Sequence, residues 1–90
     1  MIEHILITMV KEECYCRRLD VPFRLAKDDT LFGFIKISSV RVTTPADDYW
    51  VLECEISKQD EYSAEDSEFL MDLSRVGFKP LKEYLKARKD

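Results

Sequence analysis

The chain has 90 residues, of which 46% are hydrophobic and 36% are charged, with two glycines and three prolines. This composition argues against disorder and predicts one folded domain over residues 1–90, with little surface left for a deep catalytic cleft. The net charge of −4 and the pI near 5.0 disfavour binding to a phosphate backbone or an anionic membrane.

The sequence also bears on the compartment. Its longest apolar stretch near the start, residues 5–10, is far shorter than the roughly 20 residues of a membrane-spanning helix. Three cysteines leave an odd thiol if one disulfide forms, and the N-terminus has no signal-peptide pattern. We therefore predict a soluble, cytoplasmic protein in a reducing compartment.

The first half of the chain has the patterns of strands. Residues 4–10 are apolar on both parities, which suits a central strand covered on both faces, and residues 11–13 follow as a turn. Residues 19–25 alternate cleanly, so one face of that strand is buried. Pro22 cannot donate a ladder hydrogen bond, so we expect it at an edge, at a bulge, or with its missing N–H facing outward.

Residues 31–44 are strand-like, but their apolar parity changes from odd to even. Ser38 and Ser39 therefore mark a bulge or bend. Residues 45–48 form a turn by composition. The strand that follows completes a hairpin, with one face that carries Trp50, Leu52, Cys54 and Ile56.

After Lys58 the period lengthens to that of a helix. Its apolar stripe consists of Phe69, Leu73 and Val76, and Ser63 is the expected N-cap. Gly77 ends this helix, with Phe78 folding back onto Leu73 in a Schellman arrangement. Pro80 suits the first turn of a second helix, whose apolar face holds Leu81, Tyr84 and Leu85. The predicted fold is α+β, with a four-stranded, mainly antiparallel meander and two C-terminal helices packed on one of its faces.

Catalytic and metal-binding motifs are weak. His4, Cys14, Cys16 and Cys54 have the chemistry of zinc ligands, but a Cys-x-Cys pair lacks the usual spacing and Cys54 sits in an apolar row. The single histidine has no nucleophile motif around it, and no phosphate-binding glycine loop can be built. We predict no cofactor and no enzymatic activity, with a zinc-stabilised module or small enzyme as the third interpretation.

The charges divide sharply near the end of the chain. Residues 59–74 carry six acids and no base, whereas residues 75–90 carry six bases and two acids. We call the six acids the acidic surface; they are Asp60, Glu61, Glu65, Asp66, Glu68 and Asp72. An ordinary solvated helix face accounts for such a cluster, and so does a docking surface for a basic partner.

The favoured prediction is a non-catalytic interaction protein that binds and modulates or inhibits another macromolecule through the acidic surface. Its partner is a protein with a basic surface. The alternative is a nucleic-acid-associated regulator that uses the basic final helix, although the preceding acidic helix would repel phosphate. The basic residues concerned are Arg75, Lys79, Lys82, Lys86, Arg88 and Lys89. A homodimer through an exposed sheet edge is a further prediction.

Overall fold

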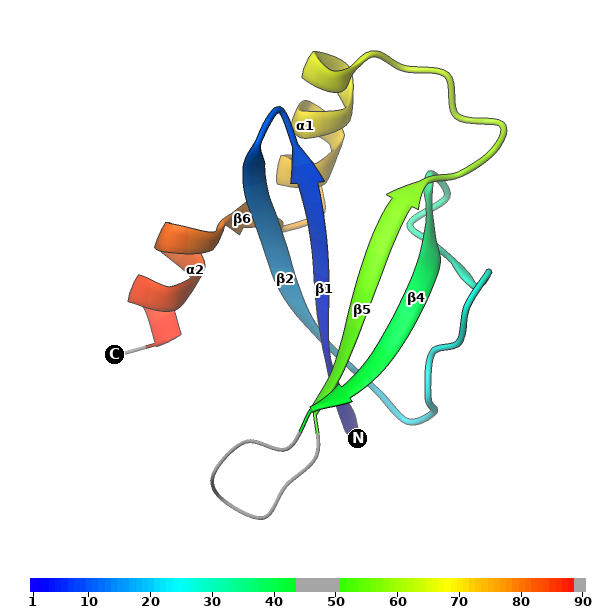
Figure 1. The fold of residues 1–90 in the computed structure, drawn as a ribbon, viewed down its shortest axis with the longest axis vertical. Helices are drawn as coiled ribbons and strands as arrows, with labels where there is room; N and C mark the ends of the chain where they lie inside the picture. The colour runs from blue at the N-terminus through cyan, green and yellow to red at the C-terminus, as the bar shows by residue number, and fades with distance from the viewer. Residues whose placement is uncertain (44–50, 89–90) are drawn as a thin grey trace.

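A computed structural model of the chain describes residues 1–43 and 51–88 and confirms an α+β fold (Figure 1). In chain order its elements are β1 (Ile2–Val10), β2 (Glu13–Val21), β3 (Thr30–Leu31), β4 (Ile35–Thr43), β5 (Val51–Lys58), α1 (Asp66–Arg75), β6 (Lys79–Pro80) and α2 (Leu81–Arg88). No helix within the described ranges is long and apolar enough to cross a membrane.

The predicted meander is wrong. The sheet has six strands in the order β3-β4-β5-β1-β2-β6, in which β5 lies beside β1 rather than at the end of a series of hairpins. The sheet curls into a half-barrel (Figure 1). β1 and β5 run parallel, with His4 opposite Leu52 and Ile7 opposite Glu55. The other pairings are antiparallel, so two hairpins, β1–β2 and β4–β5, are joined by one parallel pair.

One face of the sheet, which we call the core face, carries the hydrophobic core. Its buried strand residues are Leu6, Val10, Ile35, Ile37, Leu52, Cys54 and Ile56. Leu25, Phe69, Leu73 and Phe78 cover them from outside the sheet. The opposite, outer face carries the odd residues of β1, among them Ile7 and Met9, and their cross-strand neighbours on β2 and β5.

The bulge in β4 is confirmed. The register with β5 shifts between Ile37 and Ser39, so Ile37 faces Ile56 and Val40 faces Cys54 on the same side of the sheet. The extra residue turns the odd apolar parity into an even one without moving the strand off the core. The predicted turn at residues 45–48 and the predicted position of Trp50 lie outside the described residues.

The strand predicted over residues 19–25 in fact begins at Glu13 and ends at Val21, and Pro22 follows it directly. Residues 22–29 then cross the core face, where Leu25 is 4% exposed. The backbone N–H of Leu25 donates to Nε2 of His4 over 3.1 Å, and Nδ1 of His4 lies 3.0 Å from the carbonyl oxygen of Ile2. The strand therefore does not continue to Leu25 as predicted, because the Leu25 N–H bonds to the His4 side chain and not to a neighbouring strand.

The first helix begins at Asp66 with Glu65 as its N-cap, two residues later than predicted from Ser63. Nζ of Lys58 binds both the Ala64 carbonyl oxygen, at 2.9 Å, and the Asp66 carboxylate, at 3.1 Å. These two contacts fix the start of the helix beside the end of β5.

The predicted Schellman ending is confirmed. The N–H of Phe78 donates to Leu73 over 3.0 Å, and the N–H of Gly77 donates to Ser74 over 3.1 Å. Gly77 has a φ of +94°, which glycine adopts without the strain of a Cβ. The Arg17 side chain donates to the Val76 carbonyl oxygen at this helix end.

The prediction that both helices pack on one face of the sheet is wrong. α1 buries Phe69 and Leu73 in the core, whereas α2 packs beside β2 beyond the short edge strand β6. Among the described residues of α2, Leu81 and Leu85 remain 37% and 49% exposed. The apolar face predicted for the second helix is therefore only partly covered.

Candidate functional site

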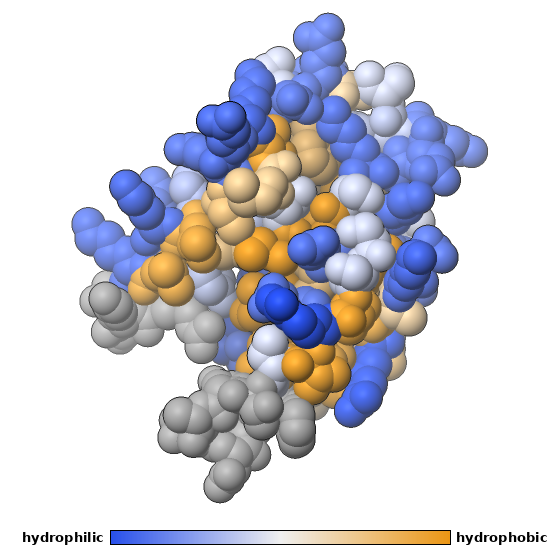
Figure 2. Space-filling view, in the orientation of Figure 1, coloured by the Kyte–Doolittle hydropathy of each residue, from blue (hydrophilic) through white to orange (hydrophobic). Residues whose placement is uncertain are grey.

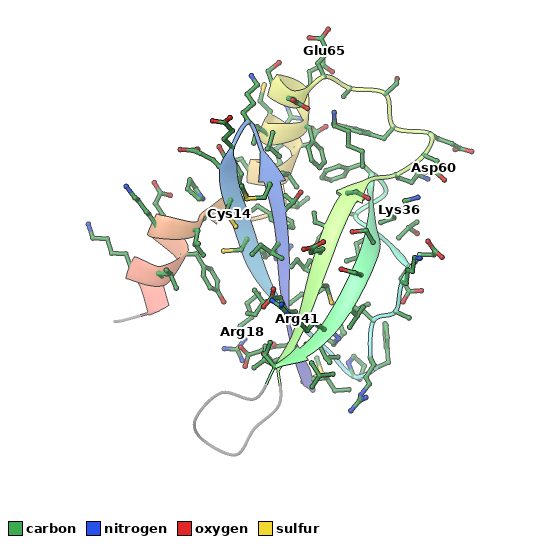
Figure 3. The ribbon with its side chains drawn as sticks, viewed as in Figure 1. Cys14, Arg18, Lys36, Arg41, Asp60 and Glu65 are labelled. Atoms are coloured by element: carbon green, nitrogen blue, oxygen red, sulfur yellow. The ribbon has the colours of Figure 1, made fainter. Side chains whose placement is uncertain are left out.

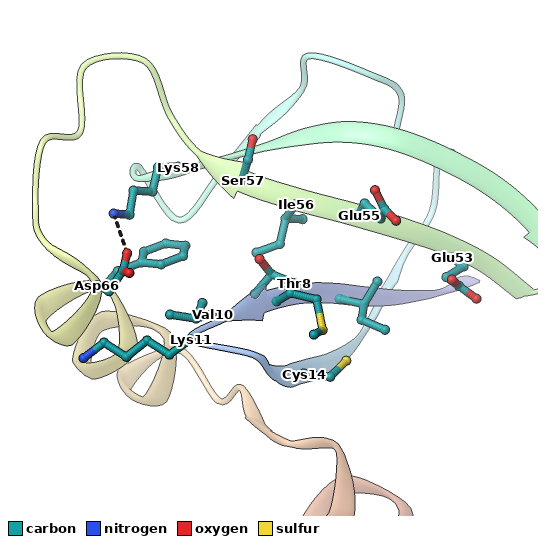
Figure 4. A pocket seen from close by; sticks show the side chains of 13 residues that line it. Thr8, Val10, Lys11, Cys14, Glu53, Glu55, Ile56, Ser57, Lys58 and Asp66 are labelled. Carbon is teal, nitrogen blue, oxygen red and sulfur yellow. Dashed lines mark hydrogen bonds and ion pairs between the residues drawn. The ribbon is translucent and has the colours of Figure 1, made fainter.

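A groove of about 610 Å³ opens where β1 and β5 separate, beside the N-terminus of α1 (Figure 4). Its volume is in the range of ligand-binding clefts. We call it the split groove; its lining residues include Thr8, Met9, Val10, Glu55, Ile56 and Phe69. Sequence reasoning did not find this groove, because it depends on the unpredicted parallel pair.

The split groove has an apolar floor and a polar rim. Val10, Ile56 and Phe69, all under 7% exposed, belong to the hydrophobic core and close the floor. Phe69 also packs against Phe34 and Tyr62, with ring centroids 6.0 and 5.9 Å away. The floor is therefore backed by an aromatic cluster that joins α1 to the segments before β4 and after β5.

Three acids and two bases line the rim. Asp66 pairs with Lys58 at 3.1 Å and Glu53 pairs with Arg41 at 2.5 Å. Glu55 is exposed, and its carboxylate accepts a hydrogen bond from the Ser39 hydroxyl over 3.4 Å. With Lys11 as the other base, the lining has three negative and two positive charges.

The six predicted acids do not form one continuous set. Asp60 pairs with Lys36 at 2.9 Å, and Asp66 pairs with Lys58. Asp72, on the last turns of α1, accepts a hydrogen bond from the Tyr62 hydroxyl and lies 3.4 Å from Arg75. Half of the acidic surface is therefore engaged within the molecule.

The other three acids, Glu61, Glu65 and Glu68, are exposed and have no ion pair among the described residues. Glu65 stands at the end of the molecule where α1 begins, and Asp60 lies on the loop that leads to it (Figure 3). Only the Asp66 carboxylate belongs to both the acidic surface and the split groove. Unpaired acids thus stand next to the groove.

The Tyr62 hydroxyl connects the acidic loop to α1. Its hydrogen bond to the Asp72 carboxylate, helped by burial, raises the pKa of Tyr62 to about 12. A carboxylate acceptor stabilises the protonated phenol and repels the phenolate. The loop at residues 60–62 is therefore attached to the helix that carries Glu65 and Glu68.

The basic residues occupy a different part of the molecule. Lys79, Lys82 and Lys86 are exposed on β6 and α2, while Arg75 belongs to α1 and lies beside Asp72. Figure 1 places α2 to one side of the sheet and α1 over its upper end. Among the described residues Asp72 and Arg75 form the one direct ion pair between the acidic and the basic stretch, and Lys79, Lys82 and Lys86 have no ion pair with the six acids.

The four potential zinc ligands do not converge. Cys14 and Cys16 face Met9 and Ile7 across the hairpin and lie on the outer face, whereas Cys54 and His4 are in the core. Both ring nitrogens of His4 already have backbone partners. Among the described residues no group of three metal-ligating side chains comes together.

The three thiols should differ in reactivity. Burial raises the pKa of Cys16 and of Cys54 to about 11, and burial together with Glu53 raises the pKa of Cys14. At pH 8 a thiol of pKa about 11 is about one part in a thousand thiolate. We expect an aromatic disulfide reagent to modify Cys14 first, and Cys16 and Cys54 only after unfolding, as read by mass spectrometry. Equal rates for all three thiols in the native protein would contradict the burial that the structure assigns.

No family model matches this chain, and searches of curated proteins and of solved structures also find no match.

Proposed function

We propose that this chain is a non-catalytic interaction protein that binds and modulates or inhibits another macromolecule, through contact between its acidic surface and a basic surface of a partner protein. The observation that supports this proposal is the exposure of Glu61, Glu65 and Glu68 without an ionic partner among the described residues. Unpaired carboxylates accelerate encounter with a basic surface and give salt-sensitive specificity.

The space-filling view is consistent with this division of the surface. Hydrophilic residues crowd the end of the molecule that carries α1, while apolar residues gather lower on the sheet and over α2 (Figure 2). A charged end next to a groove with an apolar floor combines the two features that interfaces use, a polar rim and a desolvated centre.

The test is an affinity capture from nuclease-treated lysate at low salt with the wild-type chain and with Glu61→Gln/Glu65→Gln/Glu68→Gln. We expect the triple variant to bind the captured protein about tenfold more weakly, because each exposed pair contributes up to about 1 kcal/mol. Asp72 is left intact, since its contact with Tyr62 is internal.

The matched control compares single changes. Glu65→Gln removes one charge at the start of α1, and Glu83→Gln removes one exposed charge from the first turn of α2. Only the former should weaken capture. Equal capture by the wild type and the triple variant would contradict the proposal.

The alternative, a nucleic-acid-associated regulator, has one observation in its favour. α2 lies apart from the acidic helix, so the repulsion expected from their proximity in sequence is reduced (Figure 1). Two results together would favour this alternative. Captured material should be lost after nuclease treatment and with Lys82→Gln/Lys86→Gln, and it should be unaffected by changes to the acidic surface.

A further inference from the structure

The end of the sheet beside α1 contains two strand edges that face each other without pairing. The ladder between β1 and β5 runs from His4 and Leu52 to Ile7 and Glu55, where it ends. β1 continues to Val10 and β5 continues to Lys58, each for three more residues. Both extensions stay paired on their outer sides, Val10 with Glu13 and Lys58 with Ile35.

The backbone of Met9 points into this separation. Val10 and Glu13 flank a two-residue turn at Lys11 and Glu12, both at positive φ, as in a type I′ hairpin. Residues that flank such a turn bond to each other, and bonding direction alternates along a strand. The N–H and C=O of Met9 are therefore directed away from β2 and toward β5, past the last β1–β5 pair.

The split groove is thus a place for one more strand. Three residues of edge correspond to about 10 Å of extended chain. An inserted strand would alternate between the two sides of the groove. One side presents the core residues Val10, Ile56 and Phe69, and the other presents Glu55 and Met9, the latter 64% exposed.

Charge identifies the occupant. The rim has three acids against the two bases Lys11 and Lys58, so its net charge is negative, and the exposed Glu65 and Glu68 at the start of α1 add to it. This charge favours Lys or Arg at the outward positions of an inserted strand. A second copy of this chain that docked through the same end would bring another acidic surface to the groove and would be repelled. The floor favours apolar side chains at the alternate positions.

We propose that the split groove receives an extended segment of the partner protein, with basic and apolar residues in alternation, as an added strand that bonds to Met9. This proposal rests on the proposed function, because the same acidic end selects the partner. The proposal adds a specific binding mode, in which the main chains pair and every second side chain enters the groove. Attraction between charges does not by itself need this pairing.

The test uses the whole chain and a capped peptide of about eight residues that alternates Lys and Val. Amide NMR should show saturable shifts at residues 8–10 and 56–58 and at least about tenfold slower exchange of the Met9 N–H. A Glu–Val peptide of equal length should not bind. A Lys–Val peptide N-methylated along one edge should lose about tenfold in affinity, because it cannot complete the main-chain bonds.

Two variants at one position supply the matched comparison. Met9→Ala removes the side chain but keeps the N–H, whereas Met9→Pro removes the N–H that faces the groove without removing a bond to β2. We expect only Met9→Pro to weaken binding, by about tenfold. If Met9→Pro does not fold, the N-methylated and unmethylated Lys–Val peptides are compared on the wild-type chain instead.

The outcomes separate the two proposals. Shifts confined to residues 60–68, or equal binding of the N-methylated peptide, overturn insertion but leave acidic docking intact. Equal binding of the Glu–Val peptide overturns charge selection, and with it the acidic docking on which this inference rests. Absence of saturable shifts at about 1 mM Lys–Val peptide overturns the insertion proposal.

Discussion

Replacement of His4 with leucine is expected to lower the free energy of unfolding by about 2–4 kcal/mol. His4 is fully buried, and its Nε2 accepts a hydrogen bond from the backbone N–H of Leu25. Because an N–H can only donate, the proton of the neutral ring lies on Nδ1, which donates to Ile2. Leucine fills the space but leaves the Leu25 N–H and the Ile2 carbonyl oxygen without this partner.

Urea denaturation of His4→Leu measures the loss, and two variants serve as references. Thr8→Val lies on the same face of β1, where Thr8 is 9% exposed, and should cost about 1 kcal/mol or less. His4→Gln retains an acceptor and should recover part of the stability. A loss below about 1 kcal/mol for His4→Leu would show that His4 does not secure the crossing segment.

The pattern of apolar residues identified the strands better than their order. Residues 4–10 are apolar on both parities, which favours a central strand with a neighbour on each side. The predicted cover on both faces is only partly present, since Met9 on the outer face is 64% exposed. A meander would leave this first strand at an edge, so the pattern itself conflicted with the predicted order. The structure resolves the conflict by placing β5 beside β1. Nothing local in residues 51–58 specifies that parallel partner, because pairing between distant strands depends on the whole core.

Signals that act over a few residues were predictable. The bulge near Ser39 follows from a parity change within one strand, and the Schellman ending follows from Gly77 between Leu73 and Phe78. The start of α1 was not predictable in the same way. Lys58, eight residues earlier than Asp66, fixes it through side-chain contacts that no capping pattern contains.

The acidic surface was a prediction from charge alone, and its division into paired and unpaired acids could not be read from the sequence. Lys36 is 24 residues from Asp60, and the two meet only because β4 and β5 form a hairpin whose end carries the loop. The split groove was even harder to predict from the sequence. Met9 and Ile56 line the same groove only because β1 and β5 are parallel neighbours that separate.

Replacement of Phe69 with alanine is expected to have the largest effect on stability, about 3–5 kcal/mol. Phe69 is 3% exposed and is one of two buried residues of α1, so its ring attaches the helix to the sheet. It also packs on Phe34 and Tyr62, and the Lys58 ammonium lies 5.4 Å from its ring centroid. Alanine removes all of these contacts and leaves a cavity.

Met71→Ala is the matched control on the same helix. Met71 is 59% exposed, and its truncation should change the free energy of unfolding by less than about 0.5 kcal/mol in the same urea titration. Similar losses for Phe69→Ala and Met71→Ala would contradict the assigned packing of α1. Phe69→Leu keeps an apolar floor but removes the aromatic ring, so it should fold with a smaller loss than alanine. Because Phe69 lines the split groove and α1 carries Glu65 and Glu68, Phe69→Leu should also weaken the Lys–Val peptide while capture through the unpaired acids persists.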